Sequence, residues 1–314
     1  MPAMITHYLL GKRLLPLSGM PAIPNRDAFL LGTQGPDIFF FFRMYPWQPG
    51  EKGMPTGVGL HGVRSSLLVD TLRTLLNEAP AEDRPILKSY ILGFLSHYAA
   101  DRTIHPFVLY WQEDLMKQEP LYAKSEGPYH YRIESALDTL LLHHDSGEYV
   151  TAFSLKSLVP KPDAERDRIL AWFYHELLLR VLDKEIPEKQ LRKLTGDFRH
   201  SMGWMTDRNE WKGKAIRFYE RTTKSGAFLS SLLRTKEVER YDYINSEHRV
   251  WLKNDNEVSR EDFYELCDDT VEVMVSVLKG FEDGLSGAEL TNDIDFAGTK
   301  FHEEVTADET DREL

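Results

Sequence analysis

Apolar residues recur every three or four positions along most of this 314-residue chain, and this periodicity constrains its fold more than any other feature. In the stretch 61–79, for example, five leucines fall on one helical face: Leu67, Leu68, Leu72, Leu75 and Leu76. No segment of useful length alternates apolar and polar residues, as a half-buried strand would. The pattern predicts an all-α protein with a multi-helix, bundle-like single domain.

Capping and helix-breaking residues set the expected helix ends. Pro85 is a favourable first residue for a helix, whereas Pro106 should interrupt that helix near His105. Gly147 is suited to end a helix, and the sequence 259–262 (Ser-Arg-Glu-Asp) resembles a capping box at the start of another. The predicted helices cover residues 61–79, 86–101, 107–117, 129–144, 163–182, 187–204, 210–233 and 259–281.

Charge and cysteine content exclude several classes of protein. The chain has 38 Lys and Arg against 50 Asp and Glu, so its formal charge is 38 − 50 = −12. This balance argues against general nucleic-acid binding and against electrostatic docking on an anionic membrane. A phosphate substrate stays compatible, because bound divalent cations would reverse the local field. The single Cys267 excludes an internal disulfide and a zinc site built from several thiolates.

The two ends of the chain carry further expectations. The N-terminal sequence lacks the features of a signal peptide, and no stretch approaches the roughly 20 apolar residues that span a bilayer. We therefore expect a cytoplasmic protein without integral membrane association. Residues 303–314 contain six acidic residues and only Arg312 as a base. We expect one helical domain over residues 1–285 and an acidic, disordered C-terminal tail over residues 286–314.

Two pairs of histidine and carboxylate stand at helical spacing. His97 and Asp101 are four residues apart, as are His130 and Glu134, so each pair lies on one helix face. Asp101 also precedes His105 by four residues, and a carboxylate between two imidazoles can bridge neighbouring metal ions. Imidazole and carboxylate together suit zinc or a similar divalent ion.

A structural interpretation of these pairs stays open. One His-x-x-x-Glu pair is most often a hydrogen-bonded pair on a helix surface. Here both pairs stand among apolar residues, such as Phe94 and Tyr98 for the first and Ile133 and Leu137 for the second. Both would then face a partly buried interior, where carboxylates need partners and metal ions are a common one.

The combined motifs resemble the zinc-dependent phospholipase C family, whose architecture the single-strand-specific zinc nucleases share. The resemblance covers roughly residues 5–142 and rests on several short motifs: Thr6-His7-Tyr8, Leu30-Leu31-Gly32, Gly35-Pro36-Asp37, Leu60-His61-Gly62, His97-Tyr98-Ala99-Ala100-Asp101, His105-Pro106 and His130-x-x-x-Glu134. It implies a helical protein with a cluster of two or three zinc ions that hydrolyses phosphate esters.

The resemblance also implies eight metal ligands: His7, Asp37, His61, His97, Asp101, His105, His130 and Glu134. The first zinc would take Asp37, His61, His97 and Asp101, and the third would take His105, His130 and Glu134. Asp101 would bridge the first zinc to a second one that also takes His7. By the same resemblance, Asp37 and Asp101 are the catalytic residues, with Asp37 as a general base.

One departure from the family concerns the second zinc. Secreted members complete that site with the amine and carbonyl of an N-terminal tryptophan, whereas this chain begins Met1-Pro2. The ion at His7 is therefore expected to be held least firmly. Nothing in this sequence resembles the lipid-binding β-domain of some toxin members, which makes a membrane substrate less expected.

The expected function is metal-dependent hydrolysis of a small phosphate ester or a phospholipid head group, with no long nucleic acid as partner. Two alternatives stay open: nuclease- or phosphatase-like activity on a small soluble ester, and a non-catalytic, metal-stabilised binding protein. An enzyme should leave a metal position open beneath a pocket.

The aromatic residues are expected to have structural roles. We expect the run Phe39 to Phe42 to lie in the core or to line an apolar pocket. Trp204, Trp211 and Phe218 are expected to pack between helices.

Overall fold

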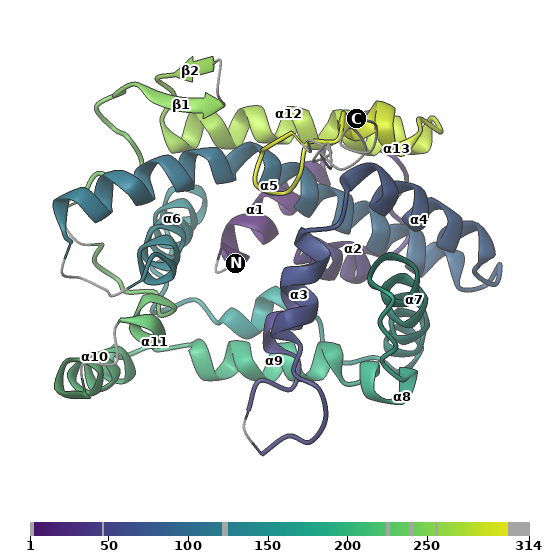
Figure 1. Ribbon diagram of the computed structural model, residues 1–314, viewed down its shortest axis with the longest axis horizontal. Coiled ribbons are helices and arrows are strands. Elements are labelled where there is room, and N and C mark those ends of the chain that lie inside the picture. Colours follow the sequence, from purple (N-terminus) through teal and green to yellow (C-terminus); the bar gives the residue numbers. More distant parts are fainter. Residues whose placement is uncertain are drawn as a thin grey trace, which may run out of the picture.

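The fold is arranged around helix α5, Arg84–Gln118, which crosses the molecule in Figure 1. The computed structural model describes residues 3–45, 47–120, 125–223, 227–238, 241–254 and 257–300. Helix α12, Phe263–Glu282, packs along one side of α5, and α2, Arg26–Gly32, packs against another. Twenty residues of α5 are buried, because it is covered on several sides. Such a helix has no continuous polar face to present to water.

The other elements surround α5, and the all-α prediction is confirmed for the described residues. They are α1 (Met4–Leu14), the 3₁₀ helix η1 (Gly35–Phe41), α3 (Met54–His61), α4 (Ser65–Glu78), α6 (Gly127–Ser146), the 3₁₀ helix η2 (Leu155–Leu158), α7 (Ala164–Leu182), α8 (Glu188–Leu191), α9 (Leu194–Met205), α10 (Trp211–Thr223), α11 (Phe228–Ser231), β1 (Trp251–Asn254), β2 (Glu257–Ser259) and α13 (Gly287–Thr291).

The predicted interruption at Pro106 is wrong, because α5 continues through it. Proline cannot donate to the carbonyl of Arg102, four residues earlier. Gly298 packs closely on this place: a Cβ there would lie 2.7 Å from the Arg102 oxygen and 2.6 Å from Pro106 Cγ. Its φ of +79° also favours glycine. The turn around Gly298 thus supports the weakened point of the helix, and His105 stays in register with Asp101.

Four other predicted helices differ from the structure. The stretch 61–79 contains two helices, since α3 ends at His61 and α4 begins at Ser65. The stretches 187–204 and 210–233 are likewise divided. Helix α12 is capped by Asp262, with Glu265 completing the capping box, whereas Ser259 ends the small antiparallel hairpin of β1 and β2. The hairpin was missed because its two strands are too short to show alternation.

The C-terminal segment differs from the expected tail. Ser286 caps α13, and Gly287 packs against the backbone of Ser66 in α4. Asp293 pairs with Arg64 at 2.7 Å, and Phe296 is buried. Residues 286–300 thus pack on the helical domain, so the expected boundary at residue 285 does not fit them. Residues 301–314, where the acidic run falls, lie outside the described residues. Among the described helices, none has the length and apolar character needed to cross a membrane.

Candidate metal centre

The eight residues expected as ligands come together beside α5. His7 lies on α1, Asp37 on η1 and His61 at the end of α3. The other five come from α5 and α6: His97, Asp101, His105, His130 and Glu134. Spacings of four residues keep the α5 and α6 side chains on one face of each helix, as the sequence pattern predicted. The structure therefore brings all eight to one place from five elements.

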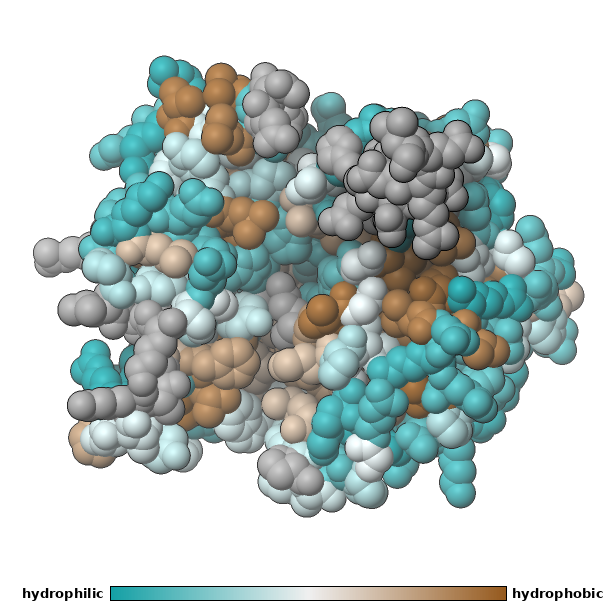
Figure 2. Space-filling view, in the orientation of Figure 1, coloured by the Kyte–Doolittle hydropathy of each residue, from teal (hydrophilic) through white to brown (hydrophobic). Residues whose placement is uncertain are grey.

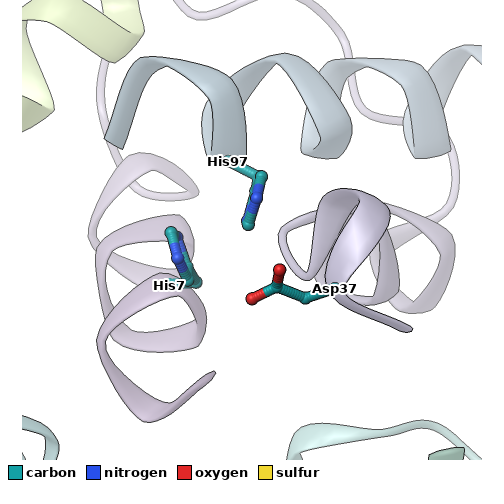
Figure 3. A group of neighbouring side chains, drawn as sticks. All are labelled: His7, Asp37 and His97. Atoms are coloured by element: carbon teal, nitrogen blue, oxygen red, sulfur yellow. The ribbon is translucent and has the colours of Figure 1, made fainter. Parts of the chain in front are cut away.

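His7, Asp37 and His97 point toward one another from three separate segments (Figure 3). Each offers a ligand atom, and these atoms lie within 4.8 Å of one another. The rings of His7 and His97 are 4.2 Å apart between centroids. A spacing of this kind is suited to donors that share one cation or two adjacent ones.

Asp101 uses its two oxygens toward different imidazoles. Oδ1 lies 3.1 Å from Nε2 of His7, whereas Oδ2 lies 3.2 Å from Nε2 of His97. His61 Nε2 is 3.6 Å from the same Oδ2 and 3.3 Å from Oδ1 of Asp37. One carboxylate thus serves two groups of histidines, which is the arrangement that a bridging ligand requires.

The remaining three residues form a neighbouring group. Nε2 of His130 lies 3.3 Å from Oε1 of Glu134, and Nε2 of His105 lies 3.5 Å from the same oxygen. Their ligand atoms also fall within 4.8 Å of one another. Two imidazoles and a carboxylate leave a fourth position of a tetrahedral zinc ion for another ligand.

Contacts on the outer side of four rings orient the histidines. Nδ1 lies within hydrogen-bond distance of an oxygen in each case: Gly57 O for His61 (2.8 Å), Thr33 O for His97 (3.2 Å), Phe296 O for His105 (2.7 Å) and Gln112 Oε1 for His130 (3.0 Å). A carbonyl oxygen only accepts, so Nδ1 must carry the proton. The lone pair of the neutral ring is then on Nε2, which faces the centre, as in metal-binding histidines.

Unsatisfied buried atoms test whether these residues fit a metal. Nδ1 of His7, Oδ1 of Asp37 and Nε2 of His97 are buried and form no hydrogen bond of acceptable geometry with the described residues, although Asp37 and His97 have ion-pair contacts at 3.3 and 3.2 Å. Buried polar atoms are almost always satisfied, and three exceptions in one cluster need an explanation. A cation bound there would supply the missing partner for Asp37 and His97. The residues present therefore fit a metal centre.

The carboxylates of the cluster stay ionised despite burial. Burial opposes ionisation of Asp101, but the nearby imidazoles of His97, His105 and His7 hold its pKa well below the usual range. The pKa of Glu134 is likewise held well below its usual range, because His130 and His105 outweigh burial. Burial alone would lower the pKa of His61, yet its contacts with Asp101 and Asp37 raise it to about 10.

This pKa predicts that metal binding releases a proton. In the metal-free protein, His61 stays protonated at pH values between its ordinary pKa of 6.5 and the raised pKa of about 10. A metal ion that binds His61 in this pH range must displace that proton. Zinc affinity should therefore rise with pH across this window, by about tenfold per pH unit for each proton released. Competition titrations against a chromophoric chelator at several pH values measure this slope. A slope that His61→Ala leaves unchanged would assign the proton to another group.

A cavity of about 420 Å³ opens over the cluster. Four of the expected ligands lie in its wall: Asp37, His61, His105 and His130. Apolar and aromatic side chains also line it, namely Phe40, Val58, Leu109 and Tyr131, together with Gln112 and Glu126. Phe39, Phe41 and Phe42 are buried, so the phenylalanine run supplies both core and one pocket residue. The centre is therefore open to a ligand on this side, unlike a closed structural site.

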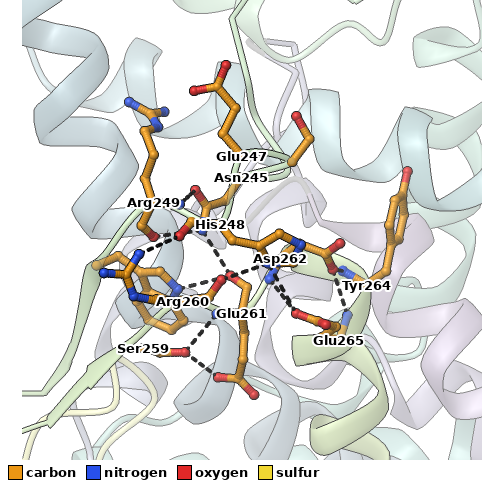
Figure 4. Close-up of polar contacts among 12 residues, drawn as sticks. Asn245, Glu247, His248, Arg249, Ser259, Arg260, Glu261, Asp262, Tyr264 and Glu265 are labelled. Atoms are coloured by element: carbon orange, nitrogen blue, oxygen red, sulfur yellow. Dashed lines mark hydrogen bonds and ion pairs between the residues drawn. The ribbon is translucent and has the colours of Figure 1, made fainter.

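A fourth group of possible ligands has a structural explanation. His248, Asp262 and Glu265 lie close together at the start of α12 (Figure 4). Asp262 accepts from the backbone N–H of Glu265, and Glu265 accepts from that of Asp262. His248 is held at the carbonyl of Arg260. These contacts form a helix cap, and nothing about the group calls for a metal.

Sequence reasoning missed Phe296, which belongs to the centre. Its ring lies 4.9 Å from that of His61 and 6.0 Å from that of His97, and its carbonyl orients His105. Phe296 lies in the stretch 286–314, for which an acidic, disordered tail was expected. Ile294 and Phe296 at alternate positions were a weak sign that this stretch packs on the domain.

Comparisons with known proteins bear on the same residues. A family model described as zinc dependent phospholipase C matches residues 6–189, more than half of the chain. All eight residues of the cluster fall inside the matched segment. Neither the curated proteins nor the solved structures contain a significant match.

Proposed function

The chain belongs to the zinc-dependent phospholipase C family, and from this premise we propose that it is a hydrolase of phosphate esters that works with two or three zinc ions. The observation that carries the proposal is the cluster of eight donors beneath an open cavity, with four rings oriented so that Nε2 faces inward. A metal kept for stability alone would be expected in a closed site.

Each ion would be held by a different combination of residues, with Asp101 shared by two of them. Asp37, His61, His97 and Asp101 would hold the first, and His105, His130 and Glu134 the third. His7 and Asp101 would hold the second, for which the described residues offer the fewest donors. A small cavity of about 10 Å³ lies between His7, Asp101, His105 and Glu134, large enough for about one water-sized ligand.

Bound zinc would supply a water of lowered pKa and positive charge to balance the phosphate oxygens. The chain's own contribution begins with Asp37, whose side chain reaches the cavity wall. Burial opposes its ionisation, yet the nearby His61 and His97 favour the charged form, and the pKa of Asp37 lies below its usual value. Asp37 is thus an ionised carboxylate at neutral pH, able to orient a water and accept its proton.

The cavity wall favours a substrate with two different ends. The charged end of an ester would face the histidines and Asp37, and an apolar or aromatic part would contact Phe40, Val58 and Tyr131. A nuclease- or phosphatase-like reaction on a small soluble ester would use the same centre. The apolar wall favours an ester that carries an apolar group.

Metal analysis tests the centre directly. Protein purified without chelator and supplied with zinc should carry at least two equivalents, and it should hydrolyse chromogenic phosphodiesters or monoesters. Chelation should abolish the hydrolysis and added zinc should restore it. His248→Ala, in the capped group at α12, is the matched control and should change neither property. Metal content at background after zinc supply would end the proposal.

A further inference from the structure

Helix α10 turns its aromatic side chains toward solvent. Trp211, Phe218 and Tyr219 are 62%, 71% and 59% exposed, whereas Gly213 and Glu220 are buried. Because Trp211 and Phe218 are seven residues apart, they lie on one stripe of the helix. Packing of Trp204, Trp211 and Phe218 between helices was expected. This is wrong for Trp211 and Phe218, and Trp204 is also 43% exposed. The helix thus has the reverse of the usual amphipathic arrangement: its aromatic side chains face solvent, and the polar Glu220 faces the protein interior.

The same helix is basic in an acidic protein. It has four cations, Lys212, Lys214, Arg217 and Arg221, and one acid, Glu220, so its net charge is 4 − 1 = +3 in a chain of −12. Glu220 faces inward and accepts from the backbone N–H groups of Leu229 and Ser230, at 2.7 and 3.3 Å.

The basic residues of α10 are positioned beside the aromatic stripe. Lys214 and Arg221, also seven residues apart, form a parallel stripe next to Trp211 and Phe218. No carboxylate of the described part of the chain forms an ion pair with Lys214, Arg217 or Arg221. Their charge is thus available to a partner.

We propose that α10 is a docking helix for an anionic lipid bilayer. Helices that lie in the bilayer interface combine exposed Trp and Phe with flanking Lys and Arg, as α10 does. A lipid surface accommodates exposed aromatics and cations side by side, whereas a protein partner would need pockets for both aromatics. Two copies of α10 packed on each other would bring like charges together. The net charge of −12 on the whole chain argues against binding to an anionic membrane, but the local charge of +3 on α10 favours it.

The position of α10 relates this surface to the metal centre. Helix α11 packs beside α10 (Figure 1) and exposes part of Phe228 and Leu229. The ring of Phe228 meets that of Tyr131 at 5.6 Å, and Tyr131 lines the cavity over the cluster. Hydrophobic residues on this face of the molecule form separate patches among hydrophilic ones (Figure 2). Docking through α10 would therefore hold the cavity near the lipid, a consequence that rests on the proposed function.

Cosedimentation with vesicles tests the docking helix. The protein should bind vesicles of phosphatidylcholine mixed with phosphatidylserine and not vesicles of phosphatidylcholine alone, and added salt should weaken binding. Trp211→Ser with Phe218→Ser, and separately Lys214→Glu with Arg221→Glu, should each lower the partition coefficient by more than about tenfold. All four side chains point outward, so circular dichroism should not change.

Matched variants elsewhere separate this effect from general surface changes. Arg192→Glu with Lys193→Glu changes the same charge at the turn before α9, and Leu252→Ser with Val258→Ser removes exposed apolar groups from the hairpin. Neither pair should alter binding. Asp101→Asn should bind vesicles normally while losing hydrolysis, so a failure of docking and a failure of the proposed reaction give different results.

Three outcomes would overturn the docking proposal. The first is the absence of sedimentation with either kind of vesicle. The second is binding that both α10 double variants leave unchanged. The third is a concentration-dependent dimer of the wild-type protein that Trp211→Ser with Phe218→Ser abolishes, since a second copy would then cover the helix.

Discussion

Asp101→Asn should lower hydrolysis by several orders of magnitude and reduce the zinc content by more than one equivalent. Oδ1 of Asp101 lies by His7 and Oδ2 by His97 and His61, so one carboxylate serves two proposed ions. An amide is neutral, is a poor bridging ligand for zinc and offers one oxygen instead of two. The two ions would also repel each other with less negative charge between them. Elemental analysis and a chromogenic phosphodiester measure the two effects.

The fold of this variant should be retained, because Asn and Asp differ little in helix propensity. Circular dichroism should match that of the wild type. His7→Ala is the informative comparison, since it should cost one equivalent of zinc and a smaller part of the activity. An Asp101→Asn protein with all its metal and full activity would show that the carboxylate is not a bridge.

Arg234→Ala should lower the free energy of unfolding by about 3–5 kcal/mol, the largest effect expected away from the metal centre. Nε of Arg234 donates to Oδ2 of Asp138 at 3.0 Å, and the two side chains are 1% and 0% exposed. Oδ1 of Asp138 accepts from the backbone N–H and the hydroxyl of Thr6, both at 2.8 Å. The substitution leaves this buried carboxylate without its cation and loosens α1 next to His7.

Urea unfolding at two pH values measures the effect and its cause. Burial raises the pKa of Asp138 even with Arg234 present, so ionisation of this carboxyl opposes folding and protonation relieves the cost. The loss in Arg234→Ala should therefore be smaller in mild acid than at neutral pH. Arg180→Ala, which breaks the solvent-exposed pairs with Glu78 and Glu176, is the control and should change the stability far less. Equal losses in the two variants would contradict the argument.

Several residues of the proposed metal centre could be found from the sequence because their pattern is local. His97 with Asp101 and His130 with Glu134 are paired by helical geometry alone, and the family resemblance added His7, Asp37 and His61. The groups that orient the rings were not predictable. The carbonyl oxygens of Gly57, Thr33 and Phe296 exist at every residue, so no residue type marks them, and only the tertiary structure shows which ones face a histidine.

The incorrect predictions have a common physical cause. The interruption at Pro106 was inferred from the local cost of proline, whereas Gly298, far along the chain, packs on the freed carbonyl and supports the helix. Burial of Trp211 and Phe218 was inferred from their apolar character, but burial depends on which face of α10 meets the domain. Interactions between distant segments override local propensity in both cases.

The contact between His105 and Phe296 has a consequence for how the centre forms during synthesis. All eight proposed ligands are present once the ribosome has passed residue 134, whereas the carbonyl that orients His105 lies 191 residues after that histidine. Closing so long a loop is a slow, late event in folding. A nascent chain can thus offer a nearly complete set of donors well before its last segment arrives. Zinc loading and the final alignment of His105 would then be separate events in time, with the second waiting for the synthesis of the segment around Phe296.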